Sequence, residues 1–151
     1  MTGIDFHVNV ADRLVYGCRL LRKVYLSGSQ VVVTGSPGLL AELDDWLWRF
    51  SALEFVPHCY ASAALTTLAV TPVVLADTLS DCGHREVLVN LGTEIPAGFE
   101  GFERFIEVVA AVPAEAEAGR QRWKHYKARG YQLVKHDLAA MAATAGSGSA
   151  S

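Results

Sequence analysis

The segment Gln30-Val-Val-Val-Thr-Gly-Ser-Pro-Gly38 decides the fold class. Its first half, Gln30 to Thr34, is a short β-branched run without charge, which is typical of a strand buried on both faces of a parallel sheet. Its second half begins a helix, because Ser36 can cap the first turn and Pro37 suits the first helical position. A buried strand that turns directly into a helix is a unit of α/β proteins.

Strands and helices also alternate on both sides of this segment. Residues 4–10 alternate as a half-buried strand does, and residues 12–26 have apolar side chains at helical spacing behind Asp12, a good N-cap. The helix that begins at Ser36 extends to about Phe50. Further elements are expected as an extended stretch at 52–58, strands at 72–76, 85–91, 106–110 and 131–136, a short helix at 99–105 and a helix at 113–129. This order predicts an α/β protein with a single-domain, open, mostly parallel sheet and helices on both faces.

Length and composition fit one folded domain. The chain has 151 residues, of which 51% are hydrophobic, and this is enough for a sizeable core without metals or disulfides. No apolar run approaches the roughly 20 residues of a membrane span. The N-terminus lacks the basic flank and apolar region of a signal peptide, so we expect a cytoplasmic protein and no membrane partner. We assign 1–138 to the domain and 139–151, which is uncharged and rich in Ala, Gly and Ser, to a flexible tail.

Three sets of residues could carry chemistry, and none forms a complete catalytic or metal-binding constellation. The turn at 35–38 lies where α/β proteins bind phosphate, but the lysine and glycines of nucleotide-binding motifs are missing. His58 and Cys59 are neighbours on an extended chain, so their side chains point to opposite faces. Cys82 and His84 share a turn, but the spacing of a four-ligand zinc site is absent. We therefore expect no catalytic residues, no metal and no cofactor.

The three cysteines are expected to be free. Their number is odd, and Cys18, Cys59 and Cys82 are widely spaced, which does not fit a disulfide framework. Buried thiols are the simplest interpretation.

The predicted helix at 113–129 lies in the most basic part of the chain. From Gly119 to His136 there are six Lys or Arg residues and no Asp or Glu, although the whole chain has a formal charge of −3. At 100° per residue, one face of the helix carries two lysines, an arginine and a tryptophan, namely Arg120, Trp123, Lys124 and Lys127. A face that is both basic and aromatic suits an acidic ligand with an apolar or aromatic end.

Two longer segments carry a family resemblance. One is Leu43-Asp-Asp-Trp-Leu-Trp-Arg-Phe50 followed by Glu54-Phe-Val-Pro-His58. The other is Val108-Val-Ala-Ala-Val-Pro113 followed by Arg122-Trp-Lys-His-Tyr-Lys-Ala-Arg-Gly-Tyr131. They resemble the LDxxLW…FxPH segment and the VVxxVP…R(Y/W)KxYRxxGY ending of the chi subunit of bacterial DNA polymerase III. The resemblance extends from about Ile4 to Leu138.

The resemblance implies a role in DNA replication. A chi subunit is a non-catalytic accessory subunit of a DNA-directed DNA polymerase, with a Rossmann-like fold that has no functional nucleotide-binding loop. It binds the acidic C-terminal tail of the single-stranded-DNA-binding protein, and through another face it binds the psi subunit, which connects it to the clamp loader. The resemblance thus implies a monomer or heterodimer that reaches DNA only indirectly.

Residue matching assigns both binding surfaces. Arg120, Trp123 and Lys124 occupy tail-binding positions of the family, Val112 matches an apolar wall, and Lys127 joins them from the same helix face. Trp48 and Phe55 match the psi-binding surface. The chain departs from the family in a shorter stretch before Arg120 and in Trp123, which replaces a common tyrosine.

Two other functions remain open from the sequence. The basic helix could bind single-stranded nucleic acid directly, with Trp123 stacked on a base, although the acidic remainder of the chain opposes this. The turn at 35–38 could belong to a small nucleotide-binding enzyme, although its motif is incomplete.

Overall fold

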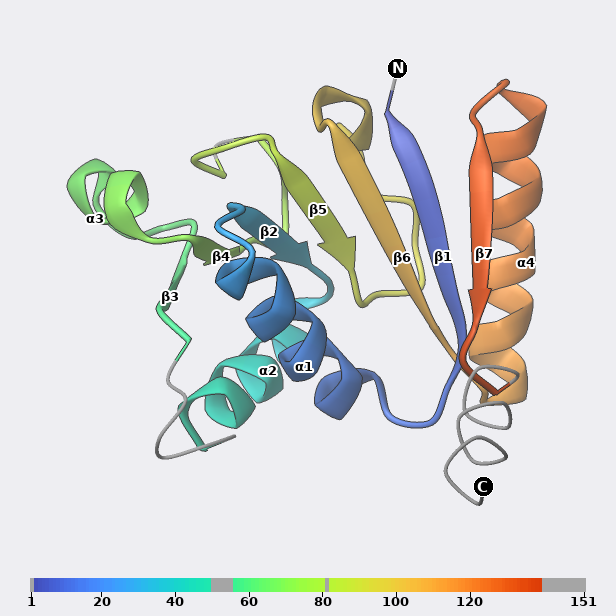
Figure 1. Cartoon of the computed structure of the whole chain (residues 1–151), viewed down its shortest axis with the longest axis horizontal. Helices are drawn as coiled ribbons and strands as arrows, with labels where there is room; N and C mark the ends of the chain where they lie inside the picture. The colour runs from blue at the N-terminus through green and yellow to red at the C-terminus, as the bar shows by residue number, and fades with distance from the viewer. Residues whose placement is uncertain (1, 50–55, 81, 140–151) are drawn as a thin grey trace.

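A single open sheet of seven strands organises the computed structural model, which describes residues 2–49, 56–80 and 82–139 (Figure 1). Every strand pairing among these residues is parallel, in the order β3-β4-β2-β5-β6-β1-β7. The predicted open α/β sheet is confirmed, and its described part is parallel throughout. The strands are β1 (Gly3–Val10), β2 (Val31–Thr34), β3 (His58–Tyr60), β4 (Val73–Leu75), β5 (Val87–Asn90), β6 (Arg104–Ala110) and β7 (Leu133–Asp137).

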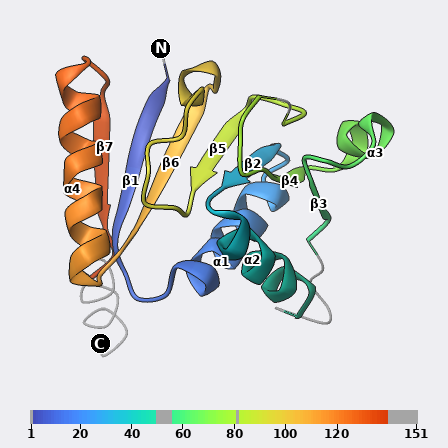
Figure 2. The same ribbon diagram turned by 180° about the vertical axis from the view of Figure 1, so that it is seen from behind.

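Helices cover both faces of the sheet, as predicted. In both views α4 lies along β7 at one end of the sheet, whereas α1 and α2 lie beside β2 (Figure 1, Figure 2). None of the described helices is both long enough and apolar enough to cross a membrane. The helices are α1 (Arg13–Leu26), α2 (Pro37–Arg49), α3 (Leu65–Val70) and α4 (Pro113–Ala128), with a 3₁₀ turn η1 (Phe99–Gly101).

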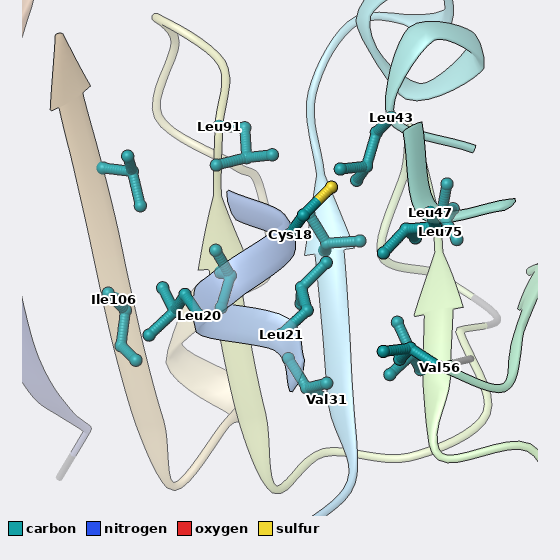
Figure 3. Packing of buried hydrophobic residues seen from close by; sticks show 14 of the residues in the cluster. Cys18, Leu20, Leu21, Val31, Leu43, Leu47, Val56, Leu75, Leu91 and Ile106 are labelled. Carbon is teal, nitrogen blue, oxygen red and sulfur yellow. The ribbon is translucent and has the colours of Figure 1, made fainter. Parts of the chain in front are cut away.

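The sheet separates two hydrophobic cores. Side chains alternate along a strand, so Val31 and Val33 lie in the core under α1 and α2, whereas Val32 lies in the core that contains α4. All three valines are fully buried, as the β-branched run predicted. Figure 3 shows the first core, in which Leu21 of α1 and Leu43 of α2 lie over the strands.

The two predicted helix caps are present. Asp12 Oδ1 accepts hydrogen bonds from the backbone N–H groups of Leu14 (2.9 Å) and Val15 (3.2 Å) at the start of α1. Ser36 Oγ accepts a bond from the Leu39 N–H (3.2 Å), and Pro37 is the first residue of α2.

Several boundaries near the C-terminal half differ from the predictions. The helix expected at 99–105 is only the turn η1, because β6 already begins at Arg104 and pairs there with both neighbouring strands. Phe105 is then buried in the sheet, with its ring centroid 5.8 Å from that of Tyr126. The last strand runs over 133–137 instead of 131–136. In each case pairing with a distant strand overrides the local pattern.

The region before β4 also differs. The extended stretch expected at 52–58 falls mostly on residues 50–55, outside the described part of the chain, and β3 continues from His58 to Tyr60. The short helix α3 has no counterpart among the predicted elements, because its N-cap, Ala64, offers no side-chain hydrogen bond. The predicted flexible tail, 139–151, lies outside the described residues except for Ala139.

A buried cluster of polar groups fastens α4 to the sheet. Glu107 of β6 is fully buried, and its Oε2 accepts hydrogen bonds from Arg122 Nε (2.9 Å) and Tyr126 Oη (2.6 Å). Its Oε1 accepts a bond from Asn90 Nδ2 (2.8 Å), and Arg122 Nη1 donates to the Thr93 carbonyl (2.8 Å). Burial raises the pKa of Glu107, and the Arg122 charge and these hydrogen bonds lower it in part. Arg122, one of the six basic residues counted between Gly119 and His136, is therefore buried and adds no charge to the exposed face of α4.

Gly119 allows α4 to approach β6 closely. A Cβ atom at this position would lie 2.7 Å from Cγ1 and 3.0 Å from Cγ2 of Val109, which is closer than carbon atoms pack. The glycine therefore brings the middle of α4 against the strand, and the following residues of the helix lie close to the sheet.

We expect Arg122→Ala to lower the free energy of unfolding by about 3–5 kcal/mol, because it leaves the Glu107 carboxylate buried without its cation. The control Lys127→Ala removes an exposed cation from the same helix and should change stability by less than about 0.5 kcal/mol. Urea unfolding measures both. Losing Arg122 raises the Glu107 pKa further in the folded state, so the deficit against wild type should be smallest at a pH below the folded-state pKa of Glu107 in wild type, where both proteins hold this carboxyl protonated, and should grow as the pH rises above that pKa. Equal stability of the two variants would contradict this role for Glu107.

We expect Gly119→Ala to destabilise the protein, because overpacking costs about 1–3 kcal/mol and outweighs the roughly 1 kcal/mol that alanine gains in a helix. In a Val109→Ala background the obstructing methyl groups are gone, so Gly119→Ala should become stabilising. A double-mutant cycle of thermal unfolding measures this reversal of sign, and the same sign in both backgrounds would exclude the close approach.

Candidate functional site

Two grooves lie where connections leave neighbouring strands toward opposite faces of the sheet. β2 leads to α2 in one core, whereas its neighbour β5 leads to η1 in the other. In the same way β1 leads to α1, and its neighbour β6 leads to α4. Ligands of open α/β sheets bind at such places, at the carboxyl ends of the strands.

The groove at β6 and β1 has an apolar floor and a helical wall. Its volume is about 500 Å³. Phe6 and Val8 of β1 and Val109 and Ala110 of β6 line it. The α4 residues that line it are Ala116, Gly119, Arg120, Trp123 and Lys124.

Three residues predicted from the helix face meet in this groove. Trp123 is half-buried and packs edge-on against Phe6, with ring centroids 5.1 Å apart and an interplanar angle of 74°. Arg120, whose side chain is 63% exposed, and Lys124, which is also exposed, lie at the rim. The structure therefore brings an aromatic ring and two cations together over apolar side chains.

Two other predicted residues lie outside the groove lining. Lys127 is exposed one turn further along α4, which runs from the carboxyl end of β6 back toward the amino ends of the strands. Val112 precedes the first turn as the N-cap residue and is 53% exposed. The helical face that suggested Lys127 is present, but the groove extends over only part of it.

Besides the apolar residues and Gly119, sequence reasoning missed two polar residues that line the groove, Lys135 and Asn9. Lys135 of β7 pairs with Phe6, and this register turns its side chain to the α4 face. Asn9 has a left-handed φ of 60° where the pairing of β1 with β6 shifts register, and its Nδ2 donates to Asp137 Oδ1 (2.8 Å). The alternation of β7 offered a signal for Lys135, whereas the position of Asn9 depends on a bulge that only the pairing reveals.

The rim of the groove is cationic. Arg120, Lys124 and Lys135 line it, and none of the described residues in the lining is acidic. Glu117, which pairs with Arg120, lies on the preceding turn outside the lining. Because the floor is apolar, the groove suits an anionic ligand that also carries an apolar group.

The second groove, at β2 and β5, has a volume of about 620 Å³ and includes the 35–37 turn. Its charged lining residues are Arg13, Asp77 and Glu94, and Arg13 is already paired with Glu115 at 2.5 Å. Ser36 Oγ is engaged in capping α2. Two carboxylates beside a neutralised guanidinium do not favour a phosphate, so this groove lacks the electrostatics of a nucleotide site.

The other candidate pairs are not joined through their functional side chains. Cys82 Sγ donates to the backbone carbonyl of His84 (3.5 Å). His58 Nε2 lies 2.9 Å from Asp44 Oδ1, whereas Cys59 packs toward the other core. In the described part of the chain no three His, Cys, Asp or Glu residues are grouped as metal ligands would be. The cysteines are free, and burial raises the pKa of the Cys18 thiol to about 11. Cys82 is buried as expected, but Cys59 is only half-buried.

The structure describes part of the second predicted surface, the one matched to psi binding. Trp48 of α2 is 60% exposed, and its ring lies 5.1 Å from that of His58. Trp46, on the same helix, is 37% exposed. Phe55 lies outside the described residues.

Comparison with known proteins identifies the family. The family model described as DNA polymerase III chi subunit, HolC, matches residues 1–134. The chain is 34% identical to the DNA polymerase III subunit chi of Pseudomonas aeruginosa over 143 residues, which cover 91% of this chain and 98% of that protein. It is 30% identical to the subunit of the same name from Haemophilus influenzae over 123 residues, covering 80% and 84% of the two chains. For the Escherichia coli subunit the identity is 29% over 131 residues, with coverage of 83% and 84%. The chain therefore belongs to the family of DNA polymerase III chi subunits, which are accessory subunits in DNA replication.

Proposed function

We propose that this chain links the clamp loader of DNA polymerase III to the single-stranded-DNA-binding protein by holding the acidic C-terminal tail of that protein in the groove between α4 and β1. It acts in the cytoplasm as an adaptor without catalysis of its own, and it reaches DNA through its partner. The observation that carries the proposal is the meeting of Arg120, Trp123 and Lys124 over one apolar floor.

The groove offers a separate place for each part of such a tail. A terminal aromatic side chain would lie on Phe6 and Val109 beside the Trp123 ring, and burying it contributes about 1.5–3 kcal/mol. Arg120 and Lys124 would attract the terminal carboxylate and the aspartates before it. Lys135 would extend this attraction across the groove from β7.

The same features favour a peptide over a nucleic-acid strand. Arg122 is buried against Glu107, so the exposed cations are fewer than the sequence suggested. Trp123 is half-buried and packed edge-on against Phe6, which leaves it less ring surface for stacking on bases. A confined apolar floor suits one terminal side chain rather than a continuous chain of nucleotides.

We further propose that the exposed face of α2 binds the psi subunit or the clamp loader, with Trp48 as an anchor. An indole that is 60% exposed, with its neighbour Trp46 partly exposed, is typical of an interface. This face lies in the half of the molecule built on α1 and α2, away from α4, so both partners would be bound at once (Figure 1).

An Asp-rich peptide ending in Pro-Phe should bind the protein, and Arg120→Ala or Trp123→Ala should weaken that binding by about 1–3 kcal/mol, the scale of an interface anchor. Calorimetric titration measures the affinity, which should fall as salt rises because exposed charges are screened. Lys127→Ala, outside the groove, should weaken binding less than Lys124→Ala.

Because Trp123 also packs on Phe6, the thermal unfolding of the Trp123→Ala variant must be compared with that of wild type. Unchanged affinity in folded Arg120→Ala and Trp123→Ala variants would reject the groove, and tighter binding of single-stranded DNA than of the peptide would favour direct nucleic-acid binding.

Trp48→Ala should weaken binding to a psi subunit by about 2 kcal/mol or more, as expected for an aromatic anchor, and should leave binding of the tail peptide unchanged. Leu65→Ala is a matched control, because Leu65 is 83% exposed on α3, outside α2. Co-purification and titration with psi compare the two variants. Equal losses in both variants, or none in Trp48→Ala, would exclude this anchor.

A further inference from the structure

One cation of the groove already has a carboxylate partner from its own helix. Arg120 donates from Nε (2.8 Å) and Nη2 (2.6 Å) to the same oxygen, Oε2 of Glu117, one turn earlier on α4. The other oxygen of Glu117, Oε1, accepts a hydrogen bond from Gln121 Nε2 (3.0 Å). Both planar N–H groups on one side of the guanidinium are thus occupied by an internal carboxylate.

The other two rim cations differ from Arg120. Lys124 and Lys135 make no hydrogen bond or ion pair with any residue that the structure describes. The hydrogen bonds from Gln121 and Arg120 and the nearby charges of Arg120 and Lys124 hold the pKa of the Glu117 carboxyl below its usual range. Glu117 is therefore ionised at neutral pH and competes for the same guanidinium edge that a carboxylate ligand needs.

We propose that Glu117 is an internal competitor of the acidic ligand for Arg120 and thereby lowers the affinity of the groove for acidic ligands. This inference depends on the proposed function, in which the ligand is an acidic peptide tail. When a ligand carboxylate binds Arg120, Glu117 must leave it and return to water. One exposed ion pair is exchanged for another, so the guanidinium contributes little net attraction.

The exchange makes the groove discriminate between ligands. A peptide that offers only carboxylates gains little at Arg120, because it replaces an existing pair of the same chemistry. A peptide that also places an apolar terminal side chain on Phe6 and against Trp123 gains the burial of that side chain in addition. With Glu117 in place, carboxylates alone contribute little binding free energy, so a ligand needs the apolar terminus as well to bind measurably.

The charge-neutral variant Glu117→Gln tests the proposal. It keeps the length of the side chain and an acceptor for Gln121, and it frees Arg120. The Kd of the Asp-rich peptide ending in Pro-Phe should fall about two- to fivefold, the effect expected for one exposed ion pair. A peptide of the same charge that lacks the Pro-Phe end should gain by the same factor, because both peptides displace the same carboxylate from Arg120. Glu42→Gln is the matched control, because it makes the same change of net charge at an exposed position on α2.

Competition must be separated from simple repulsion between Glu117 and the ligand. In an Arg120→Ala background the competitor has no guanidinium to occupy, so Glu117→Gln should leave the Kd unchanged. If Glu117→Gln tightens peptide binding equally with and without Arg120, Glu117 only repels the ligand. If Glu42→Gln tightens peptide binding as much as Glu117→Gln does, net charge alone acts. Either result overturns the proposal. In a structure of the complex, Arg120 should face a ligand carboxylate, and a complex in which it keeps Glu117 would also overturn it. If wild type itself fails to bind the peptide, the proposed function is rejected first.

Discussion

The hydrogen bonds that two residues of the last helix donate to one buried carboxylate determine the rest of the site. Glu107 holds Arg122 and Tyr126, which are four positions apart and therefore lie on one side of α4. With these two side chains directed into the protein, the rotation of the helix about its own axis is fixed. Arg120 and Trp123 then lie on the flank that borders β1, and their meeting in one groove follows from the buried bonds rather than from attraction between them.

Local sequence signals predicted most of the framework and the central part of the site. Strand β2, its following helix and the Ser36 cap depend on neighbouring residues, so they were predictable from the segment around Thr34. The Asp12 cap was predictable in the same way from the start of α1. The groove residues Arg120, Trp123 and Lys124 were predictable because helical spacing alone places them together. The start of β6, the bulge at Asn9 and the inward position of Arg122 depend on distant partners. One missed signal was present, because Glu107 interrupts an apolar strand, and a carboxylate in such a place needs a buried cation.

The two switch points of the sheet show how one architecture provides two different surfaces. At β2 and β5 the turn and helix start of a phosphate site are retained, but carboxylates and a neutralised arginine surround them. At β6 and β1 the same topological arrangement carries cations and an apolar floor. The fold supplies a hollow at both places, and the side chains at the ends of the strands decide which chemistry each hollow accepts.

The strand order also has a consequence for synthesis of the protein on the ribosome. β1, the first strand to be made, lies between β6 and β7, which are the last strands of the sheet in the chain. Its register partners are about a hundred residues away, so β1 has no neighbour in the sheet until β6 has left the ribosome. The groove has walls from β1, β6, α4 and β7, and therefore cannot be complete before β7 has been synthesised. A partner that recognises the groove is bound only by chains that include β7, and a product truncated before β7 lacks the complete site.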